Sequence, residues 1–242
     1  MLISGNKCDK IYDRLLKMEG YVFMTVTVRG DLEQLNTPIY HVEAVTPKVS
    51  PLYAFAKRGF DILFSLCVGA LGLLPMLIIA LLIKLDSKGP VIFRQERVGK
   101  DGKIFTMLKF RSMRDDAEQN GPQWAEKEDD RCTKVGCILR KTRLDELPQL
   151  WNILKGDMSL VGPRPERAYF YDQFETYIHG FRNRLAVRPG LTGWAQVSGG
   201  YDLKPEEKIV YDMEYIENMS MRMDLRCLVR TVRLVFTHEG AR

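Results

Sequence analysis

One uninterrupted apolar run constrains the fold of this chain more than any other feature. From Ile62 to Ile83 there are 22 residues without a charged side chain, and Ser65 and Cys67 are the only mildly polar ones among them. A helix of this length is about 33 Å long, which is enough to cross the hydrocarbon core of a bilayer. The whole 242-residue chain is 28% charged and carries a net charge of +5, so the run differs sharply from its surroundings.

Helix-breaking residues lie inside this run. Pro75 is well within it, and Gly69 and Gly72 come just before. An interior proline removes a helix hydrogen bond and kinks the helix, so we expect two half-helices of roughly 13 and 8 residues that enter and leave one face of a membrane. Basic residues at both flanks, such as Lys57 and Lys84, predict that both ends lie on the cytoplasmic side. A plain transmembrane helix and a buried core helix remain alternatives from spacing alone.

The composition excludes several classes of protein. Apolar residues make up 45% of the chain and aromatic residues 10%, which is incompatible with intrinsic disorder. The five cysteines form no CxxC pair, and the three histidines are far apart, so we expect neither a zinc site nor a disulfide framework. This cysteine usage indicates a reducing compartment. The N-terminus lacks an apolar stretch of signal-peptide length, so we expect no export.

The pattern divides the chain into three parts. Residues 1–52 form an N-terminal extension of unknown role, in which residues 21–28 and 38–45 have the composition of short strands. Residues 53–88 contain the apolar run, and residues 89–242 form the remaining domain.

The third part begins with a predicted β element. Strand-like residues 90–93 are followed by VGKDGK at 98–103, which predicts a hairpin turn before a second strand at 104–110. Residues 115–130 carry seven acids against one lysine and are expected to form a solvated loop. The remainder is predicted to be mainly helical.

Residues 139–165 hold the densest charge pattern. Three cations in LRKTR precede the adjacent carboxylates Asp145 and Glu146, and the rigid sequence GPRP follows. Thr142 with Asp145 three residues later resembles a helix capping box, so a purely structural role remains open. Carboxylates amid cations also suit phosphoryl transfer, which needs a nucleophile, a divalent cation and Arg or Lys on the phosphate oxygens. No Walker A, GxGxxG, HExxH or GxSxG motif is present, so other common active sites lack support.

Together these segments resemble a known family, the bacterial sugar transferases, which are monotopic polyprenyl-phosphate phosphoglycosyl transferases. The resemblance covers residues 53–242 and rests on ordered blocks: KRGFDIL at 57–63, the proline-broken run, GPVIFRQERVGKDGKIFTMLKFRSM at 89–113, residues 139–165, VRPGLTGWAQVSG at 187–199 and the tail at 211–231. It implies an α+β, mainly helical monotopic membrane protein. In that fold a proline-broken re-entrant helix, interfacial amphipathic helices and a small β element surround a cytoplasmic catalytic domain.

The resemblance also implies a reaction. Members of the family transfer a phosphosugar from a UDP-sugar to undecaprenyl phosphate, releasing UMP, in the first membrane step of surface polysaccharide synthesis. By resemblance Asp145 is the catalytic nucleophile, which forms a covalent phosphosugar-aspartyl intermediate. Glu146 assists by deprotonating or positioning the lipid phosphate. Magnesium is the implied cofactor, bound near Asp145 and the diphosphate.

Further positions follow from the same resemblance. The implied phosphate-binding residues are Lys109, Arg140, Arg164 and Arg188. In the re-entrant helix, Pro75 is placed at the break, with Arg58 and Asp61 near the base. The implied partners are the UDP-sugar, undecaprenyl phosphate and membrane lipids, with a homodimer as a further option. The implied location is the bacterial inner membrane, with the catalytic domain on the cytoplasmic face.

Alternatives to this interpretation remain. The segment 224–238 has an apolar face and a basic face, which suits either an interfacial helix or an ordinary amphipathic core helix. A magnesium-dependent membrane phosphohydrolase would use the same residues with water as the acceptor. A third alternative is a non-catalytic membrane-bound scaffold or nucleic-acid binder built on the basic segments. Nucleic-acid binding is the weakest of these, because no aromatic residues interleave a basic patch and because the apolar run is present. The sequence does not indicate which sugar is transferred.

Overall fold

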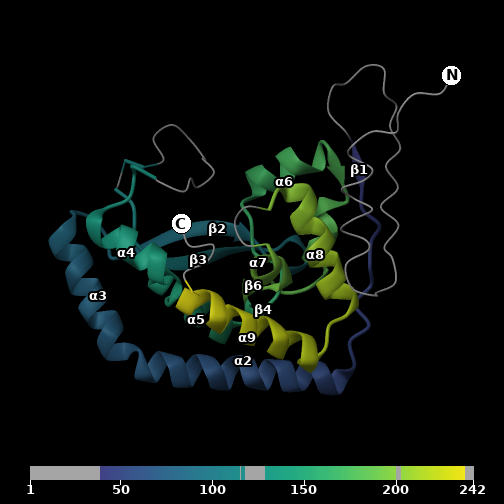
Figure 1. Ribbon diagram of the computed structural model, residues 1–242, viewed down its shortest axis with the longest axis horizontal. Helices are drawn as coiled ribbons and strands as arrows, with labels where there is room; N and C mark the ends of the chain where they lie inside the picture. Colours follow the sequence, from purple (N-terminus) through teal and green to yellow (C-terminus); the bar gives the residue numbers. More distant parts are fainter. Residues whose placement is uncertain (1–38, 115, 118–128, 200–202, 238–242) are drawn as a thin grey trace.

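A computed structural model describes residues 39–114, 116–117, 129–199 and 203–237 (Figure 1). Its helices are α2 (Pro51–Leu71), α3 (Leu73–Asp86), α4 (Lys134–Thr142), α5 (Gln149–Lys155), α6 (Ala168–Glu175), α7 (Trp194–Ser198), α8 (Pro205–Glu217) and α9 (Met221–Thr237). The 3₁₀ turns are η1 (Lys100–Gly102), η2 (Leu144–Glu146) and η3 (Phe181–Ala186). The strands are β1 (Tyr40–His41), β2 (Ile92–Val98), β3 (Ile104–Phe110), β4 (Ser159–Val161), β5 (Ile178–His179) and β6 (Gly190–Thr192). The predicted mixture of helix and strand, with helix dominant, is confirmed.

The strands form three small two-stranded sheets within the described residues. The predicted hairpin is confirmed: β2 and β3 pair antiparallel from Ile92 opposite Phe110 to Val98 opposite Ile104. Its first strand begins at residue 92 rather than 90. The strand predicted within residues 38–45 is β1, which pairs in parallel with β5. The strand predicted at 21–28 and most of the acidic segment 115–130 lie outside the described residues.

The apolar run forms a broken helix. Helices α2 and α3 meet at Gly72 and are bent by 62°. The break falls before Pro75 because a proline ring clashes with the carbonyl four residues earlier, here that of Leu71. Pro75 itself sits in the first turn of α3, where a missing N–H breaks no helix bond. The segments are 21 and 14 residues long, longer than predicted: α2 already begins at Pro51, with Ser50 as its N-cap, and α3 begins before Pro75 and continues past the apolar run to Asp86.

The broken helix exposes apolar side chains and buries polar ones, which is the opposite of a helix packed in a globular core. The only buried residues of α2 are the polar Asp61 and Ser65, and α3 buries only Ile79 and Ile83. The exposed large apolar side chains are Leu52, Phe55, Phe60, Leu63, Phe64, Leu66, Leu71, Leu73, Leu74, Leu77, Ile78, Leu81, Leu82 and Leu85. The buried core-helix alternative is therefore wrong, because the run keeps most of its apolar side chains outside the core and buries only Ile79 and Ile83.

The lengths of the helices bear on the two membrane geometries, a single transmembrane helix and a bent pair of helices. Among the described residues, no single helix is long and apolar enough to cross a bilayer. The bent pair of α2 and α3 passes that test by length and composition when taken together.

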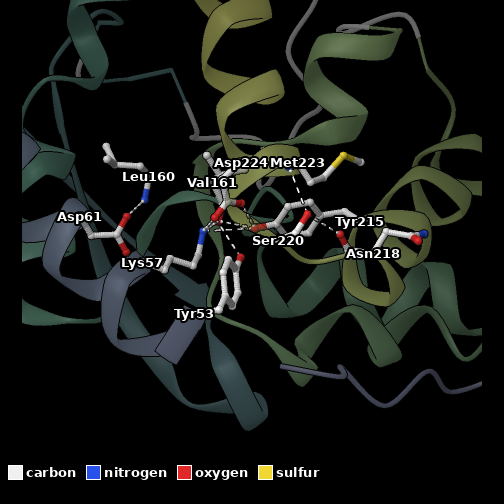
Figure 2. A network of polar contacts seen from close by, with 10 residues as sticks. All are labelled: Tyr53, Lys57, Asp61, Leu160, Val161, Tyr215, Asn218, Ser220, Met223 and Asp224. Atoms are coloured by element: carbon white, nitrogen blue, oxygen red, sulfur yellow. Dashed lines mark hydrogen bonds and ion pairs between the residues drawn. The ribbon is translucent and has the colours of Figure 1, made fainter. Parts of the chain in front are cut away.

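Buried polar contacts hold the N-terminal half of α2 on the rest of the protein (Figure 2). Lys57 Nζ lies 2.8 Å from Asp224 Oδ2 of α9 and donates to the carbonyl of Val161 at 3.0 Å. Asp61 Oδ1 accepts a hydrogen bond of 3.0 Å from the backbone N–H of Leu160. Arg58 donates to two carbonyl oxygens at the C-terminal end of α5, at 2.6 and 2.8 Å. The structure thus places Arg58 and Asp61 at the junction between the broken helix and the core.

A close glycine contact fixes α4 against the segment after β3. A Cβ atom at Gly136 would lie 1.9 Å from the carbonyl oxygen of Ser112. That same oxygen accepts a hydrogen bond from the backbone N–H of Thr133, the N-cap of α4, at 3.1 Å. Any side chain at position 136 therefore has to push α4 away from its support.

We expect Gly136→Ala to lower the free energy of unfolding by roughly 2 kcal/mol, as overpacking against backbone does. The matched control is Gly59→Ala in α2, where a new Cβ meets nothing within 4 Å and helix propensity rises by about 0.5–1 kcal/mol. Chemical unfolding in detergent measures both. Equal stability of the two variants would contradict this account of how α4 is placed.

Candidate active site

The adjacent carboxylates Asp145 and Glu146, called the dyad below, lie on a sharp turn. Helix α4 ends at Arg143 in the left-handed conformation, with φ 58°, and the chain then enters η2. The turn buries both carboxylates, which are 7% and 8% exposed. The capping-box alternative is wrong, because the hydroxyl of Thr142 donates back to carbonyl oxygens of α4 at 2.8 and 3.2 Å.

The dyad lines a cavity of about 320 Å³ that is rich in cations. Its basic lining residues are Arg97, Lys109, Arg111, Arg114, Arg131, Arg140, Arg143, Arg164, Arg167, Arg184 and Lys208. Its acidic lining residues are Asp145, Glu146, Glu166 and Asp212. This excess of positive charge favours a ligand with phosphate groups, because arginine binds phosphate oxygens bidentately.

Glu146 is tied to two cations from different parts of the chain. Lys109 Nζ of β3 lies 3.1 Å and Arg164 Nη2, from the loop after β4, lies 2.6 Å from the same Oε1 atom. Burial raises the pKa of Glu146, but Arg164 and Lys109 lower it by more, so that the pKa ends well below its ordinary value. Glu146 is therefore ionised and holds both cations at the dyad.

Asp145 has a different environment from its neighbour. Among the described residues, its carboxylate takes part in no hydrogen bond or ion pair, although it lines the cavity. Burial raises the pKa of Asp145 to about 6, against the opposing charge of Lys109 and with a further increase from Glu146. A buried, unpaired carboxylate with a pKa just below neutrality is ionised at pH 7.5 and is not blocked by a protein partner.

The predicted phosphate-binding residues separate into two groups. Lys109, Arg140 and Arg164 all line the cavity with the dyad. Arg140 lies 3.3 Å from Cys132 Sγ and 3.7 Å from Asp129. Arg188 is exposed, and its Nε donates to the carbonyl oxygen of Gly156 at 3.0 Å, just after α5. The cavity lining does not include Arg188, so the geometry lends no support to its predicted phosphate contact.

The sequence reasoning missed a second set of cavity residues. Glu166, Arg184, Gln196, Lys208 and Asp212, called the mixed-charge wall below, come from the loop after β4, η3, α7 and α8. Arg184 Nη2 lies 2.6 Å from Asp212 Oδ2. Burial raises the pKa of Asp212 to about 6 and lowers that of Lys208. The one local signal was the four-residue spacing of Lys208 and Asp212, which puts both on one face of α8.

The described residues provide a limited ligand set for magnesium. They contain no group of three or more His, Cys, Asp or Glu side chains that could hold a metal ion. Magnesium at phosphate substrates commonly uses only one or two carboxylates, with phosphate oxygens and waters completing the octahedron. The unpaired carboxylate of Asp145 fits that requirement.

Comparison with known proteins agrees with this geometry. Residues 52–238 match a family described as bacterial sugar transferase. The chain belongs to the bacterial sugar transferase family. The matched range contains the broken helix, the dyad and the mixed-charge wall, so the cavity lies entirely within the family's shared region.

Several proteins whose names describe undecaprenyl-phosphate sugar-phosphate transferases are similar over most of this chain. A UDP-N-acetylgalactosamine-undecaprenyl-phosphate N-acetylgalactosaminephosphotransferase of Aeromonas hydrophila is 45% identical over 86% of the chain and 54% of its own length. A UDP-glucose:undecaprenyl-phosphate glucose-1-phosphate transferase of Escherichia coli is 39% identical, over 91% and 48%. One of the same description from Caulobacter vibrioides is 42% identical, over 76% and 71%. The chain thus spans about half the length of the first two relatives.

The two carboxylates of the dyad should respond oppositely to neutralisation. The pKa of Asp145 is about 6 in the folded protein, above the ordinary 3.8. At pH 7.5 the carboxylate is ionised in both states, so folding has to bury a charge that the folded protein stabilises less well than water does. Asp145→Asn removes that penalty, which is on the order of 2 kcal/mol, and should raise the thermal unfolding temperature. The gain should vanish as the pH falls towards 4, because the folded protein then binds the proton and the wild type regains this stability.

Glu146→Gln provides the matched comparison. It leaves Lys109 and Arg164 without their carboxylate and should cost roughly 2 kcal/mol, less than a fully buried pair because both cations retain some contact with water. Thermal unfolding of both variants in EDTA, between pH 4 and 8, measures these effects. Parallel destabilisation by the two substitutions would contradict the assigned charge states.

Proposed function

We propose that this protein transfers a sugar 1-phosphate from a UDP-sugar to undecaprenyl phosphate. The observation that carries the proposal is the unpaired, buried carboxylate of Asp145 in a cavity lined by cations. The names of the Aeromonas, Escherichia and Caulobacter relatives supply the substrate class. On this basis the product is the first lipid-linked sugar of a bacterial surface polysaccharide.

The reaction divides into two displacements at one phosphorus atom. A carboxylate oxygen of Asp145 attacks the phosphorus next to the sugar, and the bond from that phosphorus to the bridging oxygen breaks, so that UMP leaves. A phosphate oxygen of the lipid then attacks the same phosphorus. The acyl-phosphate bond breaks, which restores the carboxylate and forms the lipid diphosphate sugar. Covalent catalysis of this kind replaces one difficult step by two easier ones.

Glu146 acts by positioning in this scheme. Its pKa is far below the range of a base that works near neutral pH. A lipid phosphate monoester is already largely dianionic at pH 7.5 and needs no strong base. Glu146 therefore serves to hold Lys109 and Arg164 where they contact the phosphate oxygens.

Magnesium is the proposed cofactor, with Asp145 as its protein ligand beside the donor diphosphate. When bound, the ion neutralises charge on the diphosphate and favours departure of UMP. The chain's own contribution is the array of cations, of which Lys109, Arg140 and Arg164 lie in the same cavity as the dyad. These side chains orient the diphosphate for attack by Asp145.

The membrane half of the proposal rests on exposed apolar surface. The broken helix α2–α3 dips into one leaflet of the inner membrane and returns to the cytoplasmic side. Helix α9 lies beside it, joined through Lys57 and Asp224, and exposes Leu225, Val229 and Val232 by 55–61%. Arg230 of α9 instead stacks on Trp194, at 4.6 Å from the ring centroid. An apolar outer face above a membrane-inserted helix suits an interfacial helix.

The nucleophile is tested by UMP release. With magnesium, undecaprenyl phosphate and a panel of UDP-glucose, UDP-galactose and their N-acetylated counterparts, the wild type should release UMP with at least one donor. Asp145→Asn should lower the rate by about 10³-fold or more, since it removes the attacking atom. The control is Asp172→Asn, an exposed carboxylate paired with Arg182. Wild-type-like rates in Asp145→Asn would refute the assignment.

Donor alone distinguishes transfer from hydrolysis. Intact mass spectrometry of the wild type after incubation with donor and magnesium should show an added sugar phosphate that Asp145→Asn does not gain. Accumulation of free sugar phosphate without lipid acceptor would favour the phosphohydrolase. Absence of any adduct under trapping conditions would favour direct transfer in a ternary complex.

Topology is tested independently of activity. Single cysteines introduced by Ser50→Cys, before α2, and Glu96→Cys, in β2, should both be shielded from an impermeant maleimide added outside intact spheroplasts. Both should react after permeabilisation, in a background without native cysteines. Labelling of only one site from outside would refute the re-entrant geometry and restore the plain transmembrane helix.

A further inference from the structure

The mixed-charge wall differs in charge balance from the part of the cavity nearest the dyad. Its buried cation Arg184 is paired with Asp212, and their side chains are 1% and 2% exposed. Glu166 likewise lies 3.2 Å from Arg97. Elsewhere in the cavity, Arg131 and Arg140 lie 2.6 and 3.7 Å from Asp129. Among the described lining residues, the wall contributes two cations and two carboxylates, whereas the rest of the lining contributes nine cations and only the two carboxylates of the dyad.

Several polar atoms of the wall have no protein partner. Among the described residues, Nε and Nη1 of Arg184 and Oε1 of Gln196 are buried without a hydrogen bond. The ring of Phe181 lies under the guanidinium of Arg184 at 5.0 Å, and Gln196 Nε2 donates to the carbonyl of Leu191 at 3.1 Å, so both side chains are fixed in place. An unsatisfied buried group lowers stability, and a ligand with matching atoms would recover that cost.

The required ligand must both donate and accept. Asp212, Glu166 and Gln196 Oε1 offer acceptors, whereas Arg184 and Lys208 offer donors. A phosphate at pH 7.5 accepts only and would be repelled by the two carboxylates. The uracil ring of the nucleotide has a single N–H donor, which cannot serve all three acceptor groups of the wall. A hexose carries several hydroxyls, each of which donates and accepts, and the adjoining Phe170 supplies apolar surface for its ring.

The wall also lies where a donor's sugar has to be. Arg164, which contacts Glu146 at 2.6 Å, lines the same cavity as Lys208 and the rest of the wall. The wall therefore adjoins the dyad. The sugar is bonded directly to the phosphorus that Asp145 attacks, so it occupies space immediately beside the dyad in any productive complex.

We propose that Glu166, Arg184, Gln196, Lys208 and Asp212 form the pocket that binds the sugar ring of the donor and sets the preference among UDP-sugars. This inference rests on the proposed function for the identity of the donor. It assigns the two ends of one cavity to different parts of the same molecule: cations near the dyad to the diphosphate, and balanced acid–base pairs to the hydroxyls.

The test compares binding of UDP-sugars with binding of UMP, which lacks the sugar. Isothermal titration is carried out on full-length Gln196→Leu and Asp212→Asn, with the tightest-binding donor of the panel. Both should weaken donor binding by about ten-fold or more, since each lost polar contact leaves a buried group unpaired. The dissociation constant for UMP should stay within about two-fold of wild type. The control is Arg182→Gln, two residues from Arg184 on η3 and paired with Asp172 at the surface.

Turnover adds a second measurement. The ratio of kcat/KM between donors should change by about five-fold or more in the wall variants and remain constant in Arg182→Gln. Lys208→Met replaces Asp212→Asn if thermal unfolding shows that the latter does not fold. Unchanged donor binding and ratios, or an equal loss of UMP binding, would overturn the inference. A wild type that binds donors through the wall but releases no UMP would refute the proposed function alone.

Discussion

The buried ion pair between Lys57 and Asp224 is the contact on which the arrangement of this protein depends. It joins a helix with an almost wholly apolar surface to the catalytic core, and such a helix has few other ways to be oriented. Lys57 also donates to the carbonyl of Val161, directly before the loop that carries Arg164. The contact therefore fixes the broken helix, α9 and the start of the loop that carries Arg164 relative to one another. One helical turn later, Asp61 accepts a hydrogen bond from the backbone N–H of Leu160 and so makes a second contact between α2 and β4.

The dyad shows how one environment can give adjacent carboxylates different tasks. Both are buried to nearly the same extent, but only Glu146 receives hydrogen bonds from Lys109 and Arg164. That pairing satisfies Glu146, whereas at Asp145 the cost of burial outweighs the attraction of Lys109 and raises the pKa to about 6. A carboxylate in this state is poorly stabilised before reaction and loses its charge on forming a bond to phosphorus. In the proposed mechanism, the cations that hold Glu146 also neutralise the phosphate that Asp145 attacks.

Local sequence signals predicted the parts of the structure that depend on near neighbours. The hairpin followed from VGKDGK and the bend from Pro75, whereas the dyad was assigned by the family resemblance of residues 139–165, since its spacing alone left a structural role open. The position of the bend shifted to Gly72 because the steric conflict of a proline falls one turn earlier. The mixed-charge wall could not be predicted, since it forms only when η3 packs on α8 and brings Arg184 to Asp212. Arg188 lies four residues after Arg184, but its side chain hydrogen-bonds to the carbonyl oxygen of Gly156. No local sequence pattern indicates this difference between the two arginines.

The size of the cavity bears on why a covalent intermediate suits this protein. About 320 Å³ lies at the lower end of the range for small-molecule sites. A UDP-sugar that fills the wall and the cations near the dyad leaves little room for a second phosphate group. If Asp145 keeps the phosphosugar, UMP can depart and vacate the cations before the lipid phosphate arrives. In the proposed mechanism the same arginines bind first the diphosphate of the nucleotide and then the phosphate of the lipid, which the proposed membrane contacts of α2, α3 and α9 would hold at the membrane surface.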